Sequence, residues 1–137
     1  MPVPPMSRKL LQQSMQARDI TAARIRRQGC MEIIVSATSL VERVGPEYLA
    51  SPARGRAPLA GARQKAQYLC HVGFGLSYTE IGARFNRDRT TVAHACRCIE
   101  DSRDAPVCDY ALSRLEHALS AMAVSLGLLH NDEASSS

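Results

Sequence analysis

The chain has 137 residues, of which 45% are hydrophobic and 22% charged, a balance typical of one soluble globular domain with a short extension. Aromatic residues make up only 4%, which argues against a sheet-rich fold and against single-strand nucleic-acid binders built on stacked rings. No apolar run is long enough to cross a membrane, and no signal peptide follows Met1. We therefore expect a cytoplasmic protein whose five cysteines remain reduced.

Basic residues are concentrated in two regions. The net charge is +4. Residues 1–30 carry six basic and one acidic side chain, and residues 63–103 carry seven basic and four acidic. Residues 104–137 instead carry one basic and five acidic side chains. A basic middle and an acidic end favour a polyanionic partner for one face, although an arginine-rich solvated surface would have the same totals.

Helices are predicted along most of the chain, with no strand and no repeat. Residues 7–28 form a polar, basic helix with a thin apolar stripe, an arm that ends at Gly29. The next helix spans about residues 33–44, with apolar residues at spacings of three and four: Ile33, Ala37, Leu40 and Val44. A short turn at 47–49, a loop at 51–61 and a helix at about 62–72 follow.

Two short helices joined by a tight turn come next. Ser77 and Glu80 have the capping-box spacing that opens a helix, and Asn86 suits the left-handed turn after it. The second helix, about residues 89–101, has an inward face of Val92, Ala95, Cys96 and Ile99 and an outward stripe of Thr90, His94, Arg97 and Asp101. This is the pattern of a helix-turn-helix, whose second helix presents polar side chains and free amides to DNA.

The last helix is predicted over about residues 107–128, after a break at Pro106. Its apolar stripe consists of Leu112, Leu115, Leu119, Met122 and Leu126. The stripe either packs on the core or forms a contact with a second copy of the chain or with a partner protein. The fold expected is therefore all-α, a compact domain of about six helices at 30–128. A basic arm at 1–29 precedes this domain, and a disordered tail at 129–137 follows it.

Three segments carry a resemblance to a known family. They are ARQKAQYL at 62–69, LSYTEIG at 76–82 and RDRTTVAHACRCIE at 87–100. Over about residues 31–120 the chain resembles the C-terminal DNA-binding domain of the bacterial replication initiator DnaA. The resemblance implies a six-helix domain with a recognition helix in the major groove.

The resemblance also implies roles for individual residues. It implies that Arg87, Asp88, Thr90 and Thr91 contact bases. It also implies that Arg63 and Gln64 contact the DNA backbone. The loop that contains Arg54 and Arg56 is implied to contact the minor groove. With residues chosen for position and charge, the candidate DNA-binding set is Arg54, Arg56, Arg63, Gln64, Lys65, Ser77, Arg87, Asp88, Arg89, Thr90, Thr91, His94 and Arg97.

Three departures from the family pattern bear on function. Asn86 alone stands where the family has two glycines, and Arg89 replaces its histidine. The phosphate-binding loop of the initiator's ATPase is missing from this sequence. We therefore expect a stand-alone relative of the DNA-binding module.

Two functions follow from these patterns. The first is a double-stranded DNA-binding regulator of replication initiation or transcription. The alternative is an adaptor that regulates the initiator or its machinery without sequence-specific DNA binding. Neither catalysis nor a cofactor is expected. A metal site is not expected either, because His94 and Cys98 share a helix face while Cys96 points elsewhere.

Overall fold

The computed structural model describes residues 7–51 and 57–128, and within them every regular element is a helix, as predicted. The elements in chain order are α1 (Arg8–Glu42), α2 (Pro46–Leu49), α3 (Ala57–Tyr68), the π-helical turn η1 (Leu69–Gly73), α4 (Tyr78–Phe85), α5 (Arg89–Ser102) and α6 (Pro106–Ser125).

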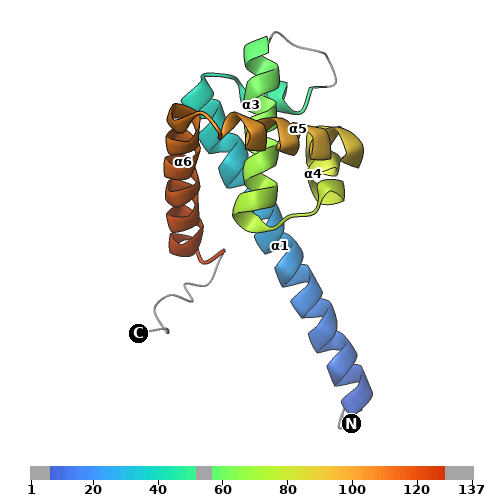
Figure 1. The fold of residues 1–137 in the computed structure, drawn as a ribbon. Coiled ribbons are helices and arrows are strands. Elements are labelled where there is room, and N and C mark those ends of the chain that lie inside the picture. Colours follow the sequence, from blue (N-terminus) through green and yellow to red (C-terminus); the bar gives the residue numbers. More distant parts are fainter. Residues whose placement is uncertain (1–6, 52–56, 129–137) are drawn as a thin grey trace.

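The helices surround one core, with α3 in its centre. Helix α4 lies on one side of α3 and α6 on the other, and α5 crosses in front of α3 from α4 toward α6. Helix α1 runs diagonally behind and extends its N-terminal half beyond the domain (Figure 1). The core takes side chains from every helix, including Ile34, Leu49, Tyr68, Phe85, Val92, Ile99, Leu112 and Leu119. Within the described residues, no helix combines the length and apolar character that a membrane span needs.

The predicted end of the first helix at Gly29 is wrong, because α1 continues through it for 35 residues. Glycine inside a helix costs only about 1 kcal/mol, and burial in α1 begins at the next residue, Cys30. A Cβ atom at Gly29 would lie 3.0 Å from the Leu128 Cδ2 atom. The glycine therefore lets the end of the domain pack closely against α1.

The third helix differs from the prediction at both ends. It begins at Ala57, inside the segment predicted to be a loop, and its last turn widens into η1 before the chain leaves at Phe74. The turn that follows is closed by Gly75, whose φ of 68° suits glycine. Arg54 and Arg56 lie outside the described residues.

Helix α6 starts one residue earlier and ends sooner than predicted. Pro106 occupies its first turn, where the missing N–H costs nothing. Gly127, with φ 74°, ends the helix, and the Leu128 amide donates to the Ala123 carbonyl at 2.9 Å. Leu112 and Leu119 are buried in the core of this same domain, whereas Met122 and Leu126 are exposed. Of the predicted stripe, only Met122 and Leu126, at 45% and 62% exposed, remain as exposed candidates for a dimer contact.

Candidate nucleic-acid interface

Helices α4 and α5 form the predicted helix-turn-helix. The Ser77 hydroxyl accepts from the Glu80 amide at 3.1 Å, and the Glu80 carboxylate accepts from the Ser77 amide at 3.1 Å. The capping box is thus confirmed, and the hydrogen bond from the Ser77 amide lowers the pKa of Glu80. Ser77 is exposed, with its hydroxyl engaged in this cap.

A tight turn sets the angle between the two helices. Asn86 adopts the left-handed conformation predicted for it, with φ 58°. The next amide, that of Arg87, donates to the Gly82 carbonyl at 2.9 Å. A Cβ atom on Gly82 would collide with the Arg87 carbonyl oxygen. Gly82 is therefore required by the close approach of the turn, a role that only the three-dimensional structure reveals.

Asp88 caps the second helix. Its carboxylate accepts from the Thr91 amide at 2.8 Å, which lowers the pKa of the Asp88 carboxyl. The side chains of Arg89, Thr90 and Thr91 in the first turn of α5 are exposed. The cap thus holds a rigid helix start whose side chains face solvent, and Asp88 itself serves that start as a cap.

The two faces of α5 agree with the prediction. Val92, Ala95, Cys96 and Ile99 are buried. His94 and Arg97 are exposed along the outward face that begins at Thr90. The His94 Nε2 and Cys98 Sγ atoms lie 3.5 Å apart, so these two residues share a face as expected. No group of three or more possible metal ligands occurs among the described residues. Burial raises the pKa of the Cys96 thiol to about 11.

Arg87 connects the turn to the segment after α2. Its guanidinium donates to the Ser51 carbonyl at 2.8 Å and to the Asn86 carbonyl at 3.0 Å. The side chain is half-buried. Arg87 therefore positions the start of α5 against the rest of the domain, and only part of its guanidinium remains for a ligand.

Arg63, predicted to contact the DNA backbone, is largely buried in the structure. It is 8% exposed, and its guanidinium donates to the carbonyls of Leu49 at 2.9 Å and Tyr48 at 3.3 Å. Burial, and then the positive charge of Arg87, lower the pKa of Arg63. The geometry gives Arg63 a structural role at the end of α2, because its N–H groups satisfy carbonyls that the short helix leaves open.

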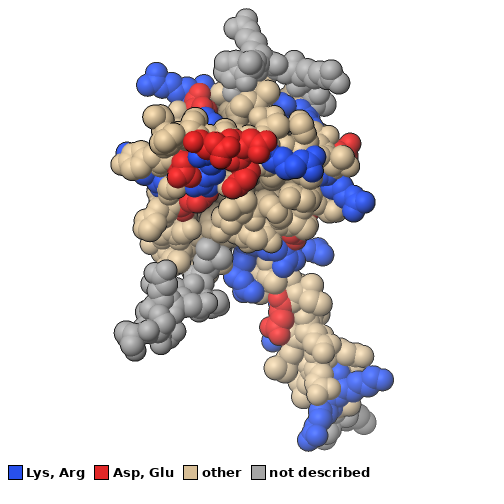
Figure 2. Space-filling view, viewed as in Figure 1, with Lys and Arg blue, Asp and Glu red and all other residues tan. Residues whose placement is uncertain are grey.

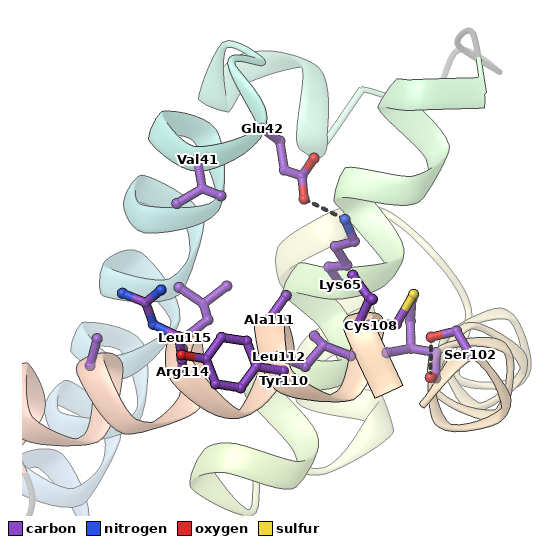
Figure 3. A pocket seen from close by; sticks show the side chains of 13 residues that line it. Val41, Glu42, Lys65, Ser102, Cys108, Tyr110, Ala111, Leu112, Arg114 and Leu115 are labelled. Carbon is purple, nitrogen blue, oxygen red and sulfur yellow. Dashed lines mark hydrogen bonds and ion pairs between the residues drawn. The ribbon is translucent and has the colours of Figure 1, made fainter. Parts of the chain in front are cut away.

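Lys65 faces a different surface from the start of α5. Its Nζ atom lies 2.6 Å from the Glu42 Oε1 atom. The pair lines an apolar groove of about 740 Å³ between α1, α3 and α6, whose wall Val41, Tyr110 and Leu115 help to form (Figure 3). Gln64, the other predicted contact of this helix, is half-buried.

Much of the positive charge counted in residues 63–103 is paired. Arg84 binds Glu32 at 2.6 Å, and Arg103 binds Asp109 at 2.7 Å and Glu116 at 2.5 Å. Figure 2 shows the acidic side chains gathered where α5 meets α6, with basic side chains at the opposite edge and along α1. Four cations of this region form no ion pair with any described residue: the buried Arg63, and Arg87, Arg89 and Arg97, which are exposed or half-buried. The unpaired charge outside the core thus lies around the start and the outward face of α5.

Comparison with known proteins identifies the family. The model of the bacterial DnaA protein helix-turn-helix matches residues 31–99. The chain belongs to this family. The matched segment contains α4, the turn and the start of α5, and it ends within α5 at residue 99.

Two relatives are chromosomal replication initiator proteins named DnaA 1. The protein of Chlamydia trachomatis (serovar D) is 34% identical over 103 residues, which cover 72% of this chain and 22% of the relative. The protein of Chlamydia muridarum is 35% identical over 101 residues, covering 70% and 22%. This chain thus spans about a fifth of the length of these DnaA relatives. No solved structure gives a significant match.

Proposed function

We propose that this chain binds double-stranded DNA through the start of α5, placed in the major groove, and acts without catalysis in the control of replication initiation or transcription. One observation carries the proposal. Arg89, Thr90 and Thr91 are exposed on a capped helix start, within the segment that matches the DnaA helix-turn-helix. As such a regulator the chain would act on the chromosome, in the bacterial cytoplasm.

The chemistry of these side chains suits base recognition. An arginine can donate two hydrogen bonds to a guanine edge, and a threonine methyl can contact the methyl of thymine. Arg97 and Arg87 lie farther along the same helix and in the turn before it, and we assign them to phosphates. The resemblance adds Arg54 and Arg56 as minor-groove contacts.

The direct test is fluorescence anisotropy of the full chain with two short duplexes, one containing the initiator's recognition box and one with the same bases scrambled. We expect at least about tenfold tighter binding to the box. With about five basic contacts, the slope of log K against log salt is expected to be roughly −4 to −5. Binding that does not respond to salt would contradict the proposal.

A pair of arginine variants separates this site from general positive charge. Arg89→Ala is expected to weaken binding to the box and to reduce its preference over the scrambled duplex. Arg114→Ala is the matched control, since Arg114 is an exposed arginine that lines the groove on α6. Equal losses in both variants would mean that charge alone, and no defined site, accounts for binding.

A second candidate function is an adaptor for the replication initiator. The apolar groove beside α6 supports it, because Val41, Val107 and Tyr110 in its wall are largely exposed. Such exposed apolar surface is typical of protein contacts. Co-purification of the initiator that survives both nuclease treatment and the combined changes Arg87→Ala, Arg89→Ala and Thr90→Ala would favour the adaptor. A homodimer through the exposed Met122 and Leu126 of α6 would instead appear as a doubled mass in sedimentation.

A further inference from the structure

The N-terminal half of α1 carries an unpaired apolar stripe. Its members, Leu11, Met15, Ala22 and Ile25, follow one another at spacings of four, seven and three residues, which places them on one face of a helix. The exposed fractions of Leu11, Met15 and Ile25 are 47%, 61% and 61%. We call these four residues the arm stripe.

The arm stripe continues a face that is covered farther along the same helix. Four residues after Ile25, Gly29 lies against the Leu128 side chain. Four residues later, Ile33 packs against the core. This face is therefore covered by the domain from Gly29 toward the C-terminal end of α1. On the N-terminal side of Gly29, from Ile25 back to Leu11, no described residue covers it. Helix α1 extends away from the domain here (Figure 1), and no other described segment covers the arm stripe.

The length and spacing of the arm stripe fit a second helix. From Leu11 to Ile25 the helix rises about 21 Å, or four turns. Apolar residues at such spacings are the positions that interdigitate with another helix in coiled-coil-like packing. An extended hydrophobic row on one face of an exposed helix is thus suited to helix–helix docking.

The charge of the arm specifies the kind of helix. Residues 7–28 carry six basic side chains and one acidic, Asp19. Arg18 lies between Met15 and Ala22 on the stripe's own face, three residues after the first and four before the second. The arm of a second copy would place basic residues opposite basic residues, which repel each other. A helix with acidic residues beside its apolar face would instead form ion pairs with the basic residues of the arm.

We propose that the arm stripe docks an amphipathic helix of a partner protein, with an apolar face and acidic flanks, one of whose carboxylates pairs with Arg18. This surface faces away from the helix-turn-helix. Arg27, two residues beyond Ile25 and so on the other side of α1, pairs with Glu80 of α4 at 2.7 Å. The partner would therefore bind while the start of α5 stays open, and the inference does not depend on DNA binding.

The test uses the full chain and three synthetic peptides about three heptads long. The first has leucines at spacings of three and four with glutamates beside them, the second has lysines in place of the glutamates, and the third has the first composition with the leucines dispersed. In fluorescence anisotropy we expect the first peptide to bind at least about tenfold more tightly than either of the others. Equal binding of the first and third peptides would overturn the proposal, because charge without a docking face would then account for it.

Two isoleucines of the arm provide a matched pair of variants. Ile25 belongs to the arm stripe, while Ile20 lies five residues away on another face and is equally exposed, at 62%. Ile25→Glu is expected to weaken binding of the first peptide by about tenfold, and Ile20→Glu by less than about twofold. Both variants add the same charge to the same helix, so circular dichroism should report the same helix content for both.

Three outcomes would overturn the assignment. Equal effects of Ile25→Glu and Ile20→Glu would remove the stripe as the site. A wild-type dimer in sedimentation that Ile25→Glu converts to monomer would make a second copy the occupant. If the first peptide fails to bind while arginine-to-alanine changes in the arm weaken DNA binding, the arm is a DNA contact. In every case the duplex measurement above reports separately on the proposed DNA function.

Discussion

Arg89 and Arg103 mark the two ends of helix α5 and count equally in the net charge, yet their surroundings differ. Arg89 is exposed and forms no ion pair with any described residue. The Arg103 side chain is 15% exposed and is enclosed by Asp109 and Glu116. The charge available to a ligand is thus set by the acidic residues that the fold brings near each arginine. One end of the helix is open for binding, and the other is fixed to the domain.

The largest effect should come from disturbing the turn that supports the exposed start of α5. Gly82→Ala places a Cβ atom against the Arg87 carbonyl, so the backbone of the turn must shift, at a cost of about 3 kcal/mol in the free energy of unfolding. Urea denaturation measures this cost. The control is Gly61→Ala in α3, where an added Cβ meets no atom within 4 Å. Gly61→Ala should be neutral or stabilising by about 0.5–1 kcal/mol, and a similar loss in both variants would remove the role assigned to Gly82.

The next largest effect should come from Arg103 at the other end of α5, and it should be a loss of stability. Arg103→Ala leaves the hydroxyl of Tyr68 and the carboxylates of Asp109 and Glu116 without this partner. We expect a loss of about 2 kcal/mol in the free energy of unfolding. Arg89→Ala should change it by less than about 0.5 kcal/mol, because the side chain is exposed. Thermal unfolding of the two variants side by side would contradict this difference if their midpoints fell together.

A smaller change at the open end should affect base discrimination. Thr90→Ala removes a methyl and a hydroxyl from the exposed first turn of α5. The preference for the box duplex over the scrambled one is expected to fall by about 1 kcal/mol, with little change for the scrambled duplex. Thr79→Ala, an exposed threonine at the start of α4, is the matched control in the same anisotropy assay. An equal loss of affinity for both duplexes would mean that Thr90 contacts the DNA backbone and not a base.

The smallest effect concerns the cap of α5 and depends on pH. The hydrogen bond from the Thr91 amide lowers the pKa of Asp88 in the folded chain. Its stabilising contribution is therefore present at neutral pH, above the unfolded pKa of about 3.9. It is lost as pH falls through the lower folded-state pKa. Asp88→Asn keeps the cap without this titration.

Melting temperatures measured between neutral and acid pH test this cap. The variant should lose slightly less stability than the wild type when the pH falls below about 4. Identical pH profiles would show that the cap does not titrate with folding.

Local features of the binding site could be predicted from the sequence, and long-range ones could not. The capping box at Ser77, the left-handed Asn86 and the buried face of α5 depend on residues within a few positions of one another, and the structure confirms them. The pairing of Arg84 with Glu32 joins residues 52 positions apart, and the bond from Arg63 to Leu49 joins residues 14 apart. No local pattern reports such contacts.

Two helix boundaries predicted wrongly, at Gly29 within α1 and at the start of α3, show the same limit. Gly29 reads as a helix end, yet the helix continues because packing by Leu128 and the core outweighs the intrinsic cost of glycine. The start of α3 at Ala57 likewise lies inside a segment rich in proline and glycine. At Gly29, packing with residues far along the chain decides that the helix continues.

The most direct measurement compares DNA binding of Arg89→Ala and Arg103→Ala by fluorescence anisotropy with the box duplex, at a temperature where both variants are folded. The account predicts that Arg89→Ala binds at least about tenfold more weakly than the wild type. Arg103→Ala, which removes the same charge from the other end of α5, should bind within about twofold of the wild type. Equal weakening in both variants, or no weakening by Arg89→Ala, would contradict the claim that the open start of α5 is the DNA-binding site.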